Sequence, residues 1–141
     1  MPLVKSQHKP TFIFKHGHFS TIYSAKLRPI PSLFQERERV TLADGDFIDV
    51  DIFNEKTSVE EKPFVLLLHG LEGDINSHYI QGLAHKLIKS NKNVGVMHFR
   101  GCSGEDNRGF RSYHSGVSDD LNTIITLLAQ KGIEVTYLIG F

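Results

Sequence analysis

The sequence predicts an α/β fold in which an antiparallel hairpin is followed by parallel strands joined through crossover helices. Three observations predict it: alternating apolar residues around an Asp-Gly turn, three short apolar runs, and two segments between those runs with apolar residues at helical spacing. The order after the hairpin is therefore strand, helix, strand, helix, strand. Crossover helices between apolar strands are typical of a parallel sheet that is covered on both faces.

The hairpin is predicted around the Asp-Gly pair at residues 44–45. Val40 and Leu42 alternate with polar residues before the turn, and apolar residues alternate with aspartates over residues 48–52 after it. An Asp-Gly pair between two alternating runs is the sequence signature of a two-stranded hairpin. The polar residues 54–62 that follow are predicted to form a loop.

Three strands are predicted after the hairpin, at residues 64–68, 94–97 and 135–139. The first is a continuous apolar run, which is the pattern of a strand buried on both faces of a parallel sheet. The last lies close to Phe141, so we expect its outer edge to be exposed and prone to association unless more chain covers it.

Two amphipathic helices are predicted between these strands, because apolar residues recur in each at helical spacing. Asn76 or Ser77 is available as the N-cap of the first helix. The second helix has Asp119 and Asp120 in its first turn, where negative charge is favourable to the helix dipole, and Gly132 can end it.

Residues 1–35 are predicted to form an irregular arm over the body formed by residues 36–141, because prolines interrupt short aromatic stretches there. The chain has 16 basic and 16 acidic residues, so its charge does not indicate nucleic acid or an anionic membrane as a partner. Its apolar runs reach about five residues, far short of a membrane span. No secretory signal is expected, and the single Cys102 fits a reducing compartment, so we expect a cytoplasmic protein.

The turn His69-Gly70-Leu71-Glu72-Gly73 comes directly after the first apolar strand. Acyl transfer needs hydrogen-bond donors aimed at the oxygen that becomes negative, and rigid backbone N–H groups serve this purpose well. In serine hydrolases one such donor comes from a turn after a central strand. Here it would be the N–H of Leu71 or, second, of Glu72. The competing interpretation is a plain strand-to-helix turn, in which glycines are common.

A second glycine-rich loop follows the next apolar strand. Arg100 and Gly101 are predicted to line the mouth of the site, or else only to shape the loop, which a pairing of Arg100 with Glu105 would brace. Cys102 and Ser103 are not predicted as nucleophiles. Neither lies on a sharp strand-to-helix turn, and the chain has no G-x-S-x-G motif.

No metal site or cofactor is expected from the eight histidines. Only His16 and His18 are close together in the sequence, no cysteine or carboxylate stands at ligand spacing, and no H-E-x-x-H motif is present. The Tyr-His-Ser-Gly segment at residues 113–116 is predicted as loop packing rather than as a catalytic element.

A set of short motifs runs through nearly the whole chain in a fixed order. The motifs are Gly17-His18 with Thr21-Ile22, Glu38-Arg39 with Asp44-Gly45-Asp46-Phe47, His69-Gly70-Leu71-Glu72-Gly73, Arg100-Gly101-Cys102-Ser103-Gly104-Glu105 and Tyr113-His114-Ser115-Gly116. Together they resemble the YheT-like branch of the α/β hydrolases, described as carboxylesterases or acylglycerol lipases. The Phe-Ser pair at residues 19–20 departs from the family's usual residues. The ordered set is far more specific than any one motif.

The resemblance implies the N-terminal part of an α/β-hydrolase sheet, with its first five strands and first two crossover helices, truncated before the nucleophile elbow. In the family a serine nucleophile follows directly after the strand that here reaches Phe141, and the acid and the histidine come later. The chain would then carry the oxyanion-hole turn, with Leu71 as donor beside Gly70, but no catalytic residue. The loops lining the site would present His69, Glu72, Gly73, Arg100 and Gly101.

The resemblance also implies that the full-length form acts on a small-molecule ester or a lipid with a medium or long acyl chain, through a Ser–His–Asp acyl-enzyme mechanism. The chain alone is expected to be inactive. The alternative is non-enzymatic: a shortened product or half-domain that binds a complementing partner. A ligand-binding protein on the same fold is a third interpretation.

Overall fold

A computed structural model of the chain describes residues 7, 9–23, 27, 29, 36–53, 62–114 and 116–141. The chain divides into two compact units, Met1–Ile30 and Pro31–Phe141, and each is described by itself. The arm boundary expected after residue 35 falls outside the described residues, as does the predicted loop 54–62 apart from Lys62.

The first unit contains two short helices, the 3₁₀ helix Phe12–Lys15 and the α-helix α1 (Gly17–Ile22). The rings of Phe14, Phe19 and Tyr23 pack together with centroids 5.2–6.2 Å apart. The expectation of irregular structure is therefore wrong for residues 12–23, where three aromatic rings pack together along two short helices.

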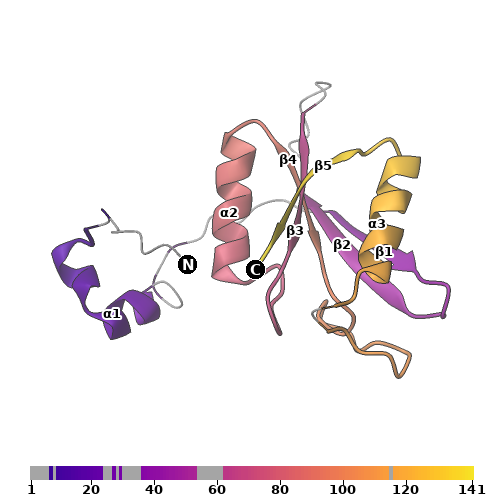
Figure 1. Cartoon of the computed structure of the whole chain (residues 1–141), viewed down its shortest axis with the longest axis horizontal. Coiled ribbons are helices and arrows are strands. Elements are labelled where there is room, and N and C mark those ends of the chain that lie inside the picture. The colour runs from indigo at the N-terminus through magenta and orange to yellow at the C-terminus, as the bar shows by residue number, and fades with distance from the viewer. Residues whose placement is uncertain are drawn as a thin grey trace. The chain divides into compact units, whose positions relative to one another are not determined.

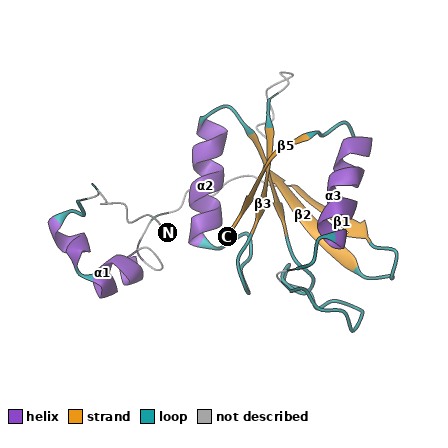
Figure 2. Ribbon diagram, viewed as in Figure 1, coloured by secondary structure: helices purple, strands orange, loops and turns teal. Residues whose placement is uncertain are grey.

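The second unit contains a five-stranded sheet with the strand order β1-β2-β4-β3-β5. Figure 2 shows its strands in orange. Its strands are β1 (Glu36–Thr41), β2 (Phe47–Phe53), β3 (Phe64–Leu68), β4 (Asn93–Met97) and β5 (Val135–Gly140). The β1–β2 hairpin is antiparallel, β2 pairs with β4 antiparallel, and β3 lies parallel to both β4 and β5. The predicted fold class is confirmed, since an antiparallel hairpin leads into parallel strands.

Two helices cover opposite faces of this sheet, α2 (His78–Lys89) and α3 (Asp119–Gln130) (Figure 1). Ile80 and Ala84 of α2 are fully buried in one apolar cluster, and Ile124 and Leu128 of α3 are buried in the other. Burying a large aliphatic side chain contributes about 1.5–3 kcal/mol. Both predicted helices are confirmed, and together they cover the two faces of the sheet.

The helix ends follow the sequence signals in part. Gly132 has a φ of 81° just beyond α3, a left-handed conformation that glycine adopts without strain. Ser77 occupies the N-cap position of α2, but its hydroxyl makes no hydrogen bond to a helix amide. It accepts instead from the N–H of Asp74, so it braces the preceding turn.

Strand β2 is buried along its whole length, although its sequence alternates between apolar residues and aspartates. Asp49 and Asp51 lie opposite Arg39 and Arg37 of β1 in the hairpin register, and each aspartate is paired with its arginine at 2.7–2.9 Å. Cross-strand ion pairs of this kind let charged positions leave water.

Strand β5 forms one edge of the sheet, as predicted. It pairs with β3 on one side, and the described residues place no strand on its other side. Tyr137 and Leu138 are about half exposed. Among the described residues, no helix is long and apolar enough to cross a membrane.

Candidate active site

The predicted site residues meet at the carboxyl ends of the parallel strands. His69 follows β3, Phe99 follows β4, and Phe141 follows β5. Because parallel strands end at the same edge of a sheet, their loops converge there, and ligands of open α/β sheets bind at this edge. The turn after β3 therefore lies between the two neighbouring strand ends.

The turn after β3 is closed by a hydrogen bond from the N–H of Gly73 to the carbonyl of Gly70 at 2.9 Å. Glu72 has a φ of 53°, which is the left-handed conformation that a type II turn requires at its third residue. A Cβ on Gly73 would lie 2.5 Å from the hydroxyl of Tyr79. The close approach of helix α2 therefore requires glycine at this position.

The backbone N–H groups of the turn differ in what they bind. The N–H of Gly70 donates to the Tyr79 hydroxyl at 3.0 Å, and the N–H of Glu72 donates to the Tyr113 hydroxyl at 2.7 Å. The N–H of Leu71 has no hydrogen-bond partner within the described part of the chain. Leu71 also has an 86% exposed side chain. One amide of the turn is thus left available to a ligand.

His69 is buried beneath this turn and connects it to the loop after β4. Its Nε2 accepts a hydrogen bond from the N–H of Phe99 at 3.1 Å, so Nδ1 carries the proton and donates to the carbonyl of Gly70 at 2.8 Å. Burial lowers the pKa of His69, although the bond to Gly70 opposes this shift. The ring is therefore held neutral, and it sets the position of the turn.

Arg100 does not present its charge to the site. Its guanidinium is 2% exposed and donates to Asp120, Asp44 and Asp46 at 2.6–3.1 Å. The expected pairing of Arg100 with Glu105 is wrong, because Glu105 binds Arg39 at 2.7 Å. Asp120 in the first turn of α3 offers both carboxylate oxygens to the guanidinium fork, a stronger arrangement than one exposed carboxylate.

The hairpin arginines hold the loop after β4 from the other side. Arg37 donates to the carbonyl of Ser103 at 2.8 Å while its other nitrogens bind Asp51. Asp51 also accepts from Nε2 of His98 at 2.6 Å. Burial opposes the charge on Asp51, but the bonds from Arg37 and His98 outweigh it and lower its pKa to about 2. The hairpin register would have predicted this network, since it places Arg37 opposite Asp51.

Cys102 and Ser103 lack the surroundings of nucleophiles. Burial raises the pKa of the Cys102 thiol, although a hydrogen bond with Tyr113 partly opposes the shift, so the reactive thiolate is disfavoured. Ser103 lies beside the carboxylate of Asp49 and helps to lower its pKa. Among the described histidines, none is hydrogen-bonded to either side chain, and the contact of His98 with Cys102 is to the backbone carbonyl only. Within the described residues, no group of three or more His, Cys, Asp and Glu side chains could hold a metal ion.

Two cavities lie beside the turn, one of about 470 Å³ and one of about 630 Å³, and both are lined by Leu71 and Tyr113. All seven residues predicted at the site line one or the other. The smaller cavity takes His69, Gly70 and Leu71, and the larger takes Leu71, Glu72, Gly73, Arg100 and Gly101. Sequence reasoning missed the roles of Tyr79 and Phe99, and it assigned Tyr113 only to loop packing.

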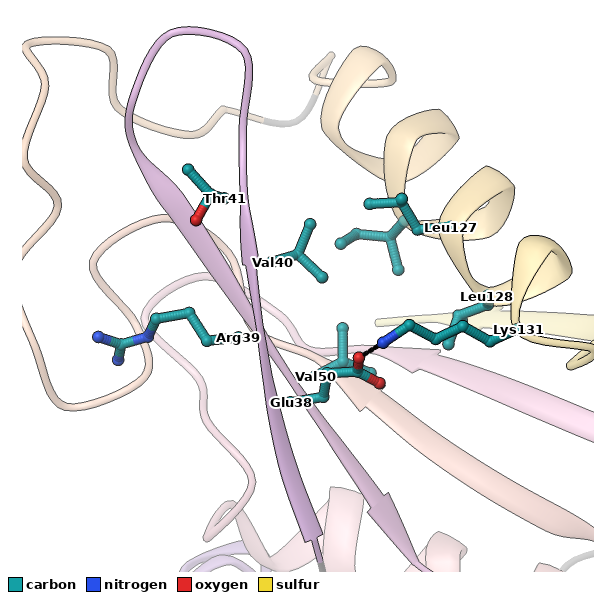
Figure 3. A pocket seen from close by; sticks show the side chains of 9 residues that line it. Glu38, Arg39, Val40, Thr41, Val50, Leu127, Leu128 and Lys131 are labelled. Atoms are coloured by element: carbon teal, nitrogen blue, oxygen red, sulfur yellow. Dashed lines mark ion pairs between the residues drawn. The ribbon is translucent and has the colours of Figure 1, made fainter.

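A third cavity of about 220 Å³ lies between β1 and α3, away from these strand ends. Val40, Leu127 and Leu128 point into it, and an ion pair between Glu38 and Lys131 spans it (Figure 3). Its described lining contains no histidine or serine, so it offers no serine–histidine pair for acyl transfer.

Comparison with known proteins places the chain among the α/β hydrolases. No protein-family model matches it. It is 36% identical over 129 residues to the putative esterase YheT of Escherichia coli, an alignment that covers 91% of this chain and 38% of YheT. It is 28% identical over 129 residues to the phospholipase ABHD3 of Homo sapiens, with 88% of this chain and 32% of ABHD3 covered.

Solved structures show the same fold at low sequence identity. An α/β serine hydrolase homologue from Coxiella burnetii superposes with a TM-score of 0.60 and 19% identity, covering 79% of this chain and 53% of that one. XC6422 from Xanthomonas campestris, an α/β serine hydrolase without a lid, gives 0.58 and 20%, covering 81% and 53%. The chain spans roughly a third of the sequence relatives' length. The chain belongs to the α/β-hydrolase superfamily.

Proposed function

We propose that this chain forms the oxyanion-hole side of a serine hydrolase that cleaves carboxylic esters, with the N–H of Leu71 as one donor to the developing oxyanion. The observation that carries this proposal is the free amide of Leu71, between two neighbours whose amides are bound by Tyr79 and Tyr113. A rigid turn presents such a donor without reorganisation when charge develops. The names of the relatives, an esterase and a phospholipase, support the reaction class.

We place the serine nucleophile directly after Phe141, with the acid and the histidine further on, so that the 141-residue chain alone has no esterase activity. Supporting this, Cys102 and Ser103 are both engaged by other groups. The enzyme to assay is an extended form of the chain. If the reading frame continues past codon 141, this form includes the encoded continuation. If a stop codon follows, the chain is fused to the remaining part of YheT. The substrate is an ester or lipid with a medium or long acyl chain.

The test removes one backbone hydrogen-bond donor, the N–H of residue 71, from the turn. Leu71 is the second residue of the type II turn, a position that favours proline, so Leu71→Pro deletes the N–H and keeps the turn. We expect kcat of the extended form to fall by about 10²-fold, the scale of losing one oxyanion donor. Leu71→Ala keeps the N–H and is the matched control. Equal activity of both variants would move the oxyanion hole elsewhere.

We further propose that the protein works in the cytoplasm, which the single Cys102 supports. A second candidate function is a non-enzymatic half-domain that binds a complementing partner or associates with itself. The exposed edge of β5 favours it, because unpaired strand edges are templates for further pairing. Sequencing the DNA past codon 141 separates the two: an in-frame Ser-Leu-Gly-Gly continuation supports the enzyme, and a stop codon there supports the half-domain.

A further inference from the structure

The two cavities beside Leu71 have different chemistry. The smaller one is walled mainly by apolar side chains, among them Leu68, Phe99, Val117 and Leu121, and its described lining holds no Asp, Glu, Lys or Arg. A cavity of this kind takes the apolar part of a ligand, since binding there removes apolar surface from water.

The larger cavity is polar and carries net negative charge. Its lining includes the carboxylates of Glu72, Asp74 and Asp106 and one cation, Arg100. The guanidinium of Arg100 is buried and already bound by three aspartates outside the cavity wall, so it does not neutralise the lining. Within the described residues Glu72 and Asp106 form no ion pair. The field at this cavity therefore repels anions.

The free amide of Leu71 lies where the two cavities adjoin, because Leu71 and Tyr113 line both. A ligand whose carbonyl oxygen binds this amide would extend its two ends into surroundings of opposite polarity. One end would be the acyl chain, in the smaller cavity. The other would be the polar head, in the larger one.

We propose that Glu72 and Asp106 are specificity determinants that admit a neutral or cationic head group on an amphiphilic ester and exclude an anionic one. This inference rests on the proposed function for the choice of an ester, but the charge of the larger cavity stands without it. Both carboxylates are exposed, so their effect acts through solvent and weakens as ionic strength rises.

The test uses the 141-residue chain and three octyl amphiphiles below their critical micelle concentrations: octyltrimethylammonium, octyl glucoside and octyl sulfate. Backbone amide NMR shifts locate binding and give Kd values at low salt. We expect shifts at Leu71 and Tyr113, and octyltrimethylammonium binding about fivefold tighter than octyl sulfate, the scale of two charges acting through water. Octyl glucoside should lie between them, and added salt should narrow the spread.

Isosteric variants identify the residues responsible. Glu72→Gln combined with Asp106→Asn should narrow the spread of the three Kd values to less than about twofold, because Asp74 is then the only carboxylate left in the described lining, whereas Glu134→Gln should leave the spread unchanged. Glu134 is an exposed glutamate that immediately precedes β5, at the amino-terminal end of that strand, whereas the cavities lie at the carboxyl ends of the strands.

Two results with the unmodified chain would each overturn the inference. One is octyl sulfate binding as tightly as octyltrimethylammonium, and the other is amide shifts confined to β5. Failure of the proposed function would give a different result. The Kd values would still differ with head-group charge, but Leu71→Pro would not change kcat of the extended form.

Discussion

The guanidinium of Arg100 and the carboxylate of Asp120 form a two-pronged ion pair inside the body of the protein. Nε donates to Oδ2 at 2.7 Å and Nη2 donates to Oδ1 at 2.8 Å. Arg100 follows β4 and Asp120 lies in the first turn of α3, so the pair fixes the loop that walls the larger cavity to the start of a helix.

Replacing Arg100 should destabilise the fold strongly. Arg100→Gln leaves the buried Asp46 and Asp120 without a cation, which should lower the free energy of unfolding by about 3–5 kcal/mol. Arg100→Lys keeps the charge but loses the fork, so its loss should be intermediate. Urea denaturation measures both. The control is Arg111→Gln, which removes an exposed pair with Asp119 and should cost less than about 1 kcal/mol. Equal losses for Gln at the two positions would contradict the role of Arg100.

Stability should fall in two steps on acidification. Burial lowers the pKa of His69 in the folded state, so its contribution is present above the unfolded value of about 6.5 and is lost as pH falls below it. Asp51 has a folded pKa of about 2, so its contribution is lost as pH falls from the unfolded ~3.9 toward that value. The second step is worth about 2–3 kcal/mol from this shift.

Urea midpoints between pH 8 and pH 2 measure these steps. His69→Asn should remove the first step, whereas replacement of the exposed His18 by Asn should leave it unchanged. A midpoint that stays flat between pH 7 and pH 5 in the unmodified chain would count against the neutral, buried His69.

The turn after β3 should tolerate a methyl group at one glycine and not at the other. A Cβ on Gly73 would lie 2.5 Å from the Tyr79 hydroxyl and 3.1 Å from the carbonyl of Gly70, whereas a Cβ on Gly70 would meet its nearest atom at 3.5 Å. Gly73→Ala should therefore lower stability by about 1–3 kcal/mol through overpacking. Gly70→Ala is the matched control and should be near neutral by thermal melting. A larger loss at Gly70 would show that the Tyr79 contact does not restrict the turn.

The 141-residue chain should associate through the edge of β5. The strand carries no charged residue, and Leu138 on it is 47% exposed, so it lacks the charges that commonly protect sheet edges. Sedimentation velocity should show oligomers that Leu138→Lys shifts toward monomer. Phe110→Lys removes another exposed apolar side chain, in a loop, and should have no comparable effect. A monomeric unmodified chain with a cooperative melt would refute this prediction.

Much of the fold could be predicted because the signals are local. A run such as residues 64–68 is apolar throughout because both faces of that strand are buried, and the helical spacing of apolar residues reports the one face each helix turns to the sheet. The Asp-Gly turn and the helix end at Gly132 could likewise be predicted from adjacent residues, because local backbone conformation selects the residues at these positions. The sequence by itself also located the turn containing Leu71, from its glycines and its place after a buried strand.

Tertiary structure decided the features that depend on residues far apart in the chain. Arg100 binds Asp46 across 54 residues, and the hydroxyl of Tyr113 reaches the amide of Glu72 across 41. Sequence spacing favoured Glu105 as the partner of Arg100 because it is near in the chain, but the packing of α3 brings Asp120 closer. The availability of the Leu71 amide is of the same kind. Whether a backbone N–H is free depends on which side chains other elements deliver to its neighbours, and only the packed sheet with its two helices determines that.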